Sequence, residues 1–198
     1  MGSRVPRATE GKRKKEAIEV VVVIMGLSGS GKSFVARILH EEFGFEWIRS
    51  DTIRKELAQI DQKQHIKVGF GEGIYSEDWT KRVYHEMIKR AKVLKDAGKH
   101  VVIDATFLKK WQRNMVKEHL GDVLFLMAFA DEEEIKRRLS QREDISDADW
   151  NIYLKQKEVF EPPKDVLLIN TQKSREEIKA ELKKILQRYG LEDSPKPY

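Results

Sequence analysis

Residues 20–33 read Val-Val-Val-Val-Ile-Met-Gly-Leu-Ser-Gly-Ser-Gly-Lys-Ser, and this stretch constrains the fold more than any other part of the chain. The β-branched run Val20–Ile24 predicts a buried parallel strand, and a helical pattern of apolar residues starts at Phe34. Between them, Gly26-x4-Gly31-Lys32-Ser33 has the spacing of a phosphate-binding P-loop. Because the motif lies between a strand and a helix, we interpret it as a P-loop rather than as a glycine-rich turn.

The residue types in this loop explain how it would hold a phosphate group. Its glycines allow tight bends, so that successive backbone N–H groups point inward at an anion, and the following helix N-terminus adds partial positive charge. We expect Lys32 to reach the β- and γ-phosphates of ATP and the Ser33 hydroxyl to bind Mg2+. The predicted ATP-binding residues are Gly26, Ser28, Gly29, Ser30, Gly31, Lys32 and Ser33.

Length and composition indicate one α/β domain. A chain of 198 residues can bury a full core, and we expect the domain to span residues 17–190. The absence of cysteine excludes disulfides and thiolate metal sites. No apolar run is long enough to span a membrane, and the N-terminus has no apolar signal-peptide core, so we expect a cytoplasmic protein with no membrane partner. The charged fraction of 36% favours a heat-adapted, thermophilic source.

The positive charge is concentrated at the N-terminus. Residues 1–16 hold six basic and two acidic side chains, which is +4 of the net charge of +5 and leaves +1 for the rest. Such a segment can be an arm that binds nucleic acid. We favour simpler interpretations, a disordered leader or in part a cloning remnant, and we expect residues 191–198 to be a frayed tail.

After the P-loop, strand patterns alternate with helix patterns, which is typical of a parallel sheet with helices on both faces. The expected strands are 20–24, 45–48, 101–104, 123–129 and 166–169. The expected later helices are 51–60, 77–97, 109–119, 132–142, 147–160 and 176–189. Ligands bind beyond the carboxyl ends of the strands in such sheets, so the residues there are the candidates for function. They are Gly26–Ser33, Ser50-Asp51, Asp104-Ala105-Thr106, Asp131 and Asn170-Thr171.

Asp51 and Arg54 follow the second expected strand. A carboxylate at this edge of the sheet suits a general base for an acceptor hydroxyl. Arg54 shares a helix face with Asp51 and is suited to bind a phosphate of the acceptor. The residues leave an alternative open, in which Asp51 is only the N-cap of the next helix.

Asp104 ends the apolar run 101–103. A carboxylate after such a strand is the pattern with which P-loop enzymes hold Mg2+, directly or through water. Because a P-loop is present, we favour this role over that of an ordinary turn aspartate. The predicted metal-binding residues are therefore Ser33 and Asp104.

Arg138 and Arg142 are four residues apart and share a face of an expected helix. Arginines stabilise the negative charge that spreads over a phosphoryl group during its transfer. By spacing alone, a solvated helix whose arginines pair with Glu132–Glu134 is the better explanation.

Several motifs together resemble the AAA_33 group of P-loop kinases over about residues 20–163. That group includes the 5′-OH polynucleotide kinases of bacteria and phages, and it is similar to zeta toxins and gluconate-type kinases. The pattern also resembles the kinase domain that is often fused behind an aminoglycoside-phosphotransferase-like domain. The motifs are the P-loop, Ser50-Asp51-x-x-Arg54-Lys55, Gly73-Ile74-Tyr75-Ser76, Val102-Ile103-Asp104-Ala105-Thr106-Phe107 and Arg138-Leu139-x-x-Arg142.

The resemblance implies a five-stranded sheet of order 2-3-1-4-5 and an arginine-bearing lid over ATP. It also implies that Asp51 is the base, that Arg54 contacts a phosphate of the acceptor strand, and that Arg138 and Arg142 are the lid arginines. The group commonly has Asp-Ala-Thr-Asn where this chain has Phe107 in the fourth position, which leaves the role of that position open.

These observations lead to one expectation of function. We expect a kinase that moves the γ-phosphoryl group of ATP, with Mg2+, to the 5′-OH of DNA or RNA. The alternatives are a small-molecule kinase, for a sugar, nucleoside, antibiotic or nucleotide-sugar, and a non-catalytic ATP-binding module. A mere switch needs no base beside an acceptor, so Asp51 argues against the module. The expected catalytic residues are Lys32, Asp51, Arg54, Arg138 and Arg142.

Overall fold

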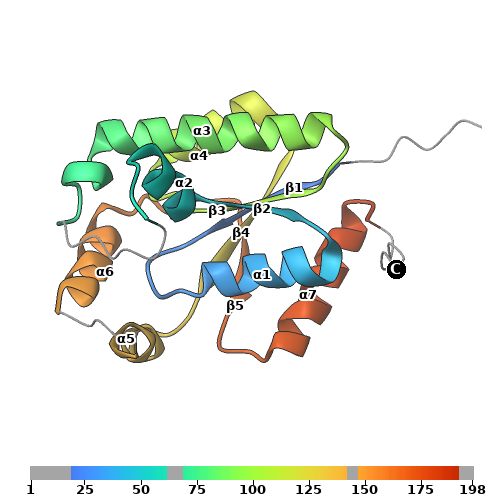
Figure 1. Ribbon diagram of the computed structural model, residues 1–198. Helices are drawn as coiled ribbons and strands as arrows, with labels where there is room; N and C mark the ends of the chain where they lie inside the picture. Colours follow the sequence, from blue (N-terminus) through green and yellow to red (C-terminus); the bar gives the residue numbers. More distant parts are fainter. Residues whose placement is uncertain (1–18, 62–68, 142–146, 192–198) are drawn as a thin grey trace, which may run out of the picture.

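The structure is a computed structural model that describes residues 19–61, 69–141 and 147–191. Within these residues, five parallel strands form one sheet in the order β2-β3-β1-β4-β5 (Figure 1). This order confirms the prediction of a parallel α/β sheet of order 2-3-1-4-5. The strands are β1 (Val21–Met25), β2 (Glu46–Arg49), β3 (Val101–Asp104), β4 (Val123–Phe129) and β5 (Leu167–Asn170).

Strand β1 explains why the chain needs helices on both faces of the sheet. It lies at the centre of the sheet, and all five of its residues are buried. Val22 and Ile24 pack into a core under one face, whereas Val21, Val23 and Met25 pack into a second core under the other. A strand that is buried on both faces reads as a continuous apolar run, because neither set of alternate side chains meets water.

Helices cover each of these cores (Figure 1). Helices α1 (Lys32–Phe43) and α7 (Arg175–Arg188) supply the first core, and α3 (Glu77–Asp96) and α4 (Lys110–Leu120) supply the second. Helix α2 (Ser50–Leu57) packs beside α3, after which comes the 3-10 turn η1 (Gly73–Tyr75). Helices α5 (Glu132–Ser140) and α6 (Asp147–Val159) lie near the start of α1.

The element bounds match the predicted ones to within a few residues. Ser76 is the N-cap of α3, because its hydroxyl accepts a hydrogen bond from the backbone N–H of Trp79 at 3.4 Å. The predicted leader at residues 1–16 and most of the predicted tail lie outside the described residues. Among the described residues, no helix is both long and apolar enough to cross a lipid bilayer.

Candidate active site

The P-loop joins β1 to α1 at the carboxyl edge of the sheet, and it carries all seven predicted ATP-binding residues. Gly29 and Gly31 have φ angles of +76° and +92°, which side-chain-bearing residues rarely adopt. A Cβ atom added to Gly31 would also lie 2.7–2.9 Å from side-chain atoms of Thr171. The Gly31 carbonyl accepts from the N–H groups of Phe34 and Val35 and so starts α1. The loop therefore wraps around a helix N-terminus, where an anion is favoured.

Lys32 is the first residue of α1, and its ammonium group lies over the loop. Its Nζ donates to the carbonyl oxygen of Leu27 at 3.0 Å. This position keeps the cation beside the loop, where the phosphates of a nucleotide would lie, so it fits the predicted role of Lys32.

Ser33 and Asp104 meet as the sequence predicts. The Ser33 hydroxyl donates to Asp104 Oδ2 at 2.8 Å, and the Asp104 side chain is only 5% exposed at the end of β3. Among the described residues, no cluster of three or more His, Cys, Asp or Glu side chains could hold a metal ion by itself. One hydroxyl and one carboxylate fit Mg2+, since this ion prefers oxygen ligands and takes most of its shell from water and phosphates.

Two further side chains from β2 reach the Asp104 carboxylate. Trp47 Nε1 donates to Oδ2 at 3.3 Å, and Arg49 Nε forms an ion pair with it at 3.9 Å. The Arg49 guanidinium also lies 4.9 Å from the centre of the Trp47 ring. Arg49 was missed from the sequence because the predicted strand ended one residue earlier; the strand-end rule applied to the observed bounds would have found it.

Asp51 is the second residue of α2 and not its N-cap, which is Arg49. Its side chain is 54% exposed and lies 3.5 Å from Lys55 Nζ. It also faces Tyr75, whose phenol pKa is raised first by burial and then by the charge of Asp51. The carboxylate is therefore open to an incoming molecule, and its role as a base stays a prediction.

Arg54, on the same helix, is only 7% exposed. Its Nη1 donates to the carbonyl oxygen of Ile74, and its guanidinium lies 4.8 Å from the centre of the Tyr75 ring. Burial lowers the pKa of Arg54. The side chain thus fastens η1 to α2, and this placement does not support the expected contact with a phosphate of the acceptor.

Packing, and not the backbone angle, explains why Phe107 departs from the family pattern. Its φ of +48° lies in the left-handed region, which asparagine tolerates far better than phenylalanine does. The fully buried ring packs edge-on against Tyr84, with centroids 5.0 Å apart. The Tyr84 hydroxyl accepts from the Phe107 N–H at 3.0 Å, and Arg113 donates to the Phe107 carbonyl at 2.8 Å. These contacts hold the loop after β3, which follows Asp104.

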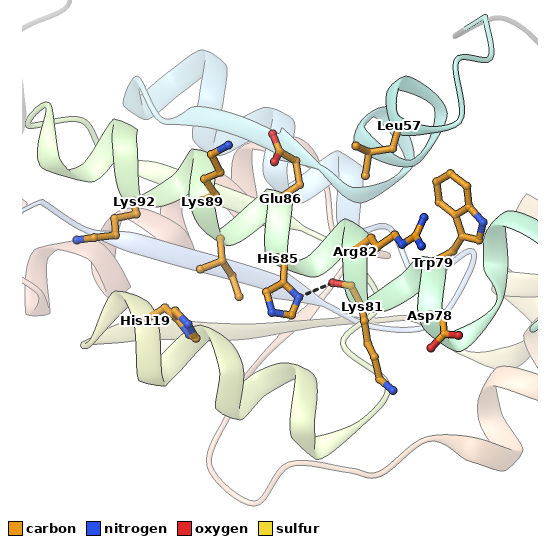
Figure 2. A pocket seen from close by; sticks show the side chains of 11 residues that line it. Leu57, Asp78, Trp79, Lys81, Arg82, His85, Glu86, Lys89, Lys92 and His119 are labelled. Atoms are coloured by element: carbon orange, nitrogen blue, oxygen red, sulfur yellow. Dashed lines mark hydrogen bonds between the residues drawn. The ribbon is translucent and has the colours of Figure 1, made fainter.

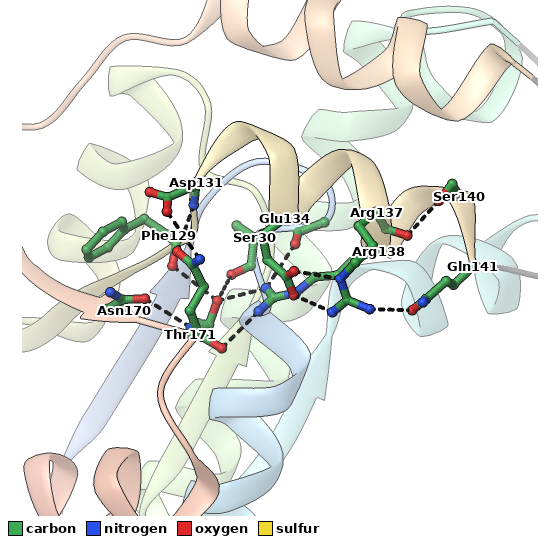
Figure 3. A network of polar contacts seen from close by, with 12 residues as sticks. Ser30, Phe129, Asp131, Glu134, Arg137, Arg138, Ser140, Gln141, Asn170 and Thr171 are labelled. Carbon is green, nitrogen blue, oxygen red and sulfur yellow. Dashed lines mark hydrogen bonds and ion pairs between the residues drawn. The ribbon is translucent and has the colours of Figure 1, made fainter.

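Arg138 projects from α5 to the P-loop (Figure 3). It donates to Glu134 at 2.7 Å, to the carbonyl of Gly29 at 3.3 Å and to the hydroxyl of Thr171 at 2.8 Å. Hydrogen bonds from Arg137 and then Arg138 lower the pKa of Glu134 to about 2. The expected pairing with the acidic residues is present for both arginines, since Arg137 and Arg138 each pair with Glu134. Arg137 is otherwise exposed, whereas Arg138 is also turned to the P-loop. Arg142 lies outside the described residues.

Helix α6 also touches the P-loop, through a residue that the sequence did not single out. The backbone N–H of Ser28 donates to Gln156 Oε1 at 2.7 Å, and the Gln156 side chain is buried. The two residues are 128 positions apart, and Gln156 lies in a charged helix with no motif of its own. No sequence signal distinguished it.

A hollow of about 960 Å3 lies along α3 and is also lined by residues of α2 and α4 (Figure 2). No P-loop residue lines it, and its lining mixes charges of both signs, with Asp78 and Glu86 among lysines. Lys81 and Lys92 pair with Glu77 and Asp96 on the same helix. We assign this face no part in catalysis, since such pairs are typical of a solvated helix.

The order of the parallel sheet, the P-loop after β1 and the hydroxyl–carboxylate pair beside it define the class: the chain has the fold of the P-loop kinases. The family model AAA_33, described as an AAA domain, matches residues 21–163. The chain therefore belongs to the AAA_33 family, and the predicted family is confirmed.

Solved kinases share this fold. A sugar kinase from Janibacter sp. is 25% identical with a TM-score of 0.61, and the match covers 86% of this chain and 95% of that one. An APS kinase from Mycobacterium tuberculosis, solved with AMPPNP and APS, is 20% identical with a TM-score of 0.62 over 85% and 98% of the two chains. A gluconokinase from Sinorhizobium meliloti is 21% identical with a TM-score of 0.55 over 87% and 98%.

Curated relatives match a smaller part of the chain. Uncharacterized proteins of Mycobacterium tuberculosis and Mycobacterium bovis are 29% identical over 87 residues. These residues are 44% of this chain but only 18% of each relative, so the match spans less than a fifth of the relatives' length.

Proposed function

We propose that this protein transfers the γ-phosphoryl group of ATP to a hydroxyl group of a small molecule. The observation that carries the proposal is the Ser33–Asp104 pair, 2.8 Å apart, at the start of the P-loop helix. Arg49, the last residue of β2, pairs in register with Asp104, and Asp51 follows two positions later. Phosphate-binding, metal-binding and proton-accepting groups thus come from neighbouring strands at one edge of the sheet.

Each group has a distinct proposed role. The backbone N–H groups of the loop and the Lys32 ammonium bind the β- and γ-phosphates and stabilise charge in the transition state. Ser33 and Asp104 would hold Mg2+, which neutralises charge on the phosphates when bound. The exposed Asp51 carboxylate accepts the proton of the acceptor hydroxyl as that oxygen attacks.

The environment of Arg54 favours a small-molecule acceptor over a polynucleotide. The polynucleotide prediction needs this arginine to grip a phosphate of the strand, but it is buried against the carbonyl of Ile74. The sugar kinase, which is 25% identical, is named for a small acceptor. The 5′-end acceptor expected from the sequence is therefore replaced here by a small alcohol.

A transfer assay with γ-labelled ATP tests this proposal. The acceptors would be sugars, sugar acids, nucleosides and aminoglycosides, with a 5′-OH oligonucleotide alongside, each with Mg2+ and with EDTA. We expect label on one class of small alcohol only with Mg2+, and we expect Lys32→Ala to abolish it because the P-loop has no second cationic side chain to replace that charge. Label on the oligonucleotide alone would support the prediction of a polynucleotide kinase instead. ATP binding without transfer to any acceptor would favour a non-catalytic ATP-binding module.

A further inference from the structure

Thr171 lies where three segments of the site meet. It follows β5, and its backbone N–H donates to the Phe129 carbonyl at 2.9 Å, which extends the pairing of β5 with β4. Its side chain is buried, and the residue is only 4% exposed. The hydroxyl oxygen lies 2.6 Å from the Ser30 carbonyl, 2.8 Å from Arg138 Nη1 and 3.1 Å from the Phe129 carbonyl (Figure 3).

The direction of these hydrogen bonds follows from the chemistry of the groups. A guanidinium can only donate, so the Thr171 hydroxyl accepts from Arg138. The hydroxyl has one proton, and the nearer of the two carbonyl oxygens is that of Ser30. A chain of hydrogen bonds therefore runs from a charged donor through Thr171 to the P-loop backbone, and the charge polarises and strengthens it.

The Ser30 carbonyl belongs to the peptide group that joins Ser30 to Gly31. A trans peptide is planar, with its C=O and N–H pointing in opposite directions. A carbonyl held toward Thr171 therefore turns the Gly31 N–H away from Thr171. The side chain of Thr171 also packs on the α-carbon of Gly31, where a Cβ atom would lie within 2.9 Å of it. Hydrogen bond and packing thus set one orientation of this peptide.

We propose that Thr171 is a positioning residue of the nucleotide site, whose hydroxyl aims the Gly31 N–H at a bound phosphate and links this peptide to Arg138 on α5. The inference rests on the proposed binding of a nucleotide by the P-loop and adds a residue 141 positions away from that loop. Thr171 does not touch the nucleotide itself; it acts through the peptide that it holds.

Thr171→Val tests the hydroxyl, because valine keeps the shape of threonine. Thr171→Ser is the matched control, since it keeps the hydroxyl and loses a methyl group. We expect the valine variant to bind ADP and ATP with Mg2+ about tenfold more weakly by calorimetry, which is about the worth of one well-aimed hydrogen bond from the Gly31 N–H to a charged phosphate. The serine variant should stay within about twofold of the wild type. Equal affinity of valine variant and wild type would overturn the inference.

A separate measurement excludes a merely structural role. In a merely structural role, the loss of the hydroxyl would lower the melting temperature without ligand and leave the nucleotide Kd unchanged. In a positioning role, it raises the Kd and reduces the rise in melting temperature that a fixed concentration of nucleotide produces. If the valine variant does not fold, Thr171→Ala against Thr171→Ser gives the same comparison, since these differ only in the hydroxyl. A wild type that binds no nucleotide would refute the proposed function, and only a binding wild type tests Thr171.

The link to Arg138 has its own test. If the Thr171 hydroxyl and the Arg138 guanidinium act through one chain of hydrogen bonds, the effects of Thr171→Val and Arg138→Ala on the nucleotide Kd are not additive. The Kd of the double variant should then lie within about twofold of the Kd of the single variant that binds more weakly. Additive effects would show that the two residues act independently and would overturn that part of the proposal.

Discussion

Asp51 and Arg54 lie three residues apart on α2, but the first is exposed and the second is buried. Asp51 is 54% exposed, so its carboxylate is open to an incoming molecule, which the proposed general base requires. Arg54 is buried and bound to a backbone carbonyl, which suits a group that holds structure. Two side chains on one helix face thus differ because η1 covers Arg54 and leaves Asp51 exposed.

Asp51→Asn should lower kcat by about 10²–10⁴-fold, the usual contribution of a general base. The amide has nearly the same shape but cannot accept the proton of the acceptor hydroxyl. Steady-state kinetics with the acceptor found in the transfer assay, together with the Kd for ATP, checks this. The ATP affinity should stay near that of the wild type. A variant with full turnover and a lower melting temperature would instead show that Asp51 only supports the helix.

Arg54→Met should lower the stability of the protein by about 1–3 kcal/mol, because the Ile74 carbonyl loses a charged donor. Methionine fills much of the same volume, so packing is largely kept. Urea unfolding measures the loss. The neighbouring Lys55→Met serves as a comparison on the same helix. Unchanged stability together with a large rise in the acceptor KM would show that Arg54 binds the acceptor, as the sequence first suggested.

Helix α5 is the element that most directly shapes the P-loop from outside. Ile135 and Leu139 pack where a Cβ atom at Gly29 would stand, at 2.9 and 3.2 Å, so the helix and the loop fit without space for a side chain. Arg138 adds hydrogen bonds to Gly29 and Thr171 from the same face. The helix therefore carries one face for the site and another, with Arg137, for solvent.

Arg138→Ala should reduce both nucleotide affinity and turnover, with turnover reduced more, because the charge is needed most in the transition state. Arg137→Ala is the matched control: it removes the adjacent arginine, which pairs with the same glutamate on the exposed side. Kinetics in ATP and calorimetry with ADP separate the two effects. Equal losses in the two arginine variants would mean that general charge on α5, and not the contact of Arg138 with the loop, is what counts.

At the scale of the whole molecule, the sheet is tied together at the end opposite to the P-loop by His100. Its Nδ1 accepts from the Val20 N–H at 3.1 Å, its carbonyl accepts from the Glu46 N–H at 2.8 Å, and its ring lies 5.3 Å from that of Phe45. One residue before β3 thus links the starts of β1 and β2. Burial lowers the pKa of His100, against the smaller opposing effect of Glu19.

The stability of the protein should therefore fall as the pH drops below the ordinary histidine pKa of 6.5. Between that value and the lower pKa of the folded state, the unfolded chain binds the proton first, so lower pH favours unfolding. Urea midpoints at several pH values check this. His100→Asn keeps an acceptor near Nδ1 but cannot titrate, so its stability should depend less on pH in this window. His119→Asn, which changes an exposed histidine of α4, is the control, and the same slope in His100→Asn and wild type would contradict the assignment.

The sequence alone determined the P-loop, the strand and helix alternation and the meeting of Ser33 with Asp104. These follow from local patterns, because a β-branched run, a glycine spacing and a strand-end carboxylate carry their meaning within a few residues, and parallel strands bring their carboxyl ends together. The family resemblance added the strand order, and the structure and the family match confirmed the strand order and the family.

Only the tertiary structure decided which side chains face the site. The burial of Arg54 depends on the carbonyl of Ile74, and the turn of Arg138 toward the P-loop depends on Thr171 beyond β5. Gln156 and Thr171 contact P-loop residues that are 128 and 141 positions away in the sequence. Periodic patterns within a helix or strand do not predict contacts at such separations. A side chain's role at such a site is set by partners that only folding brings near, and for that reason the acceptor could not be read from the motifs.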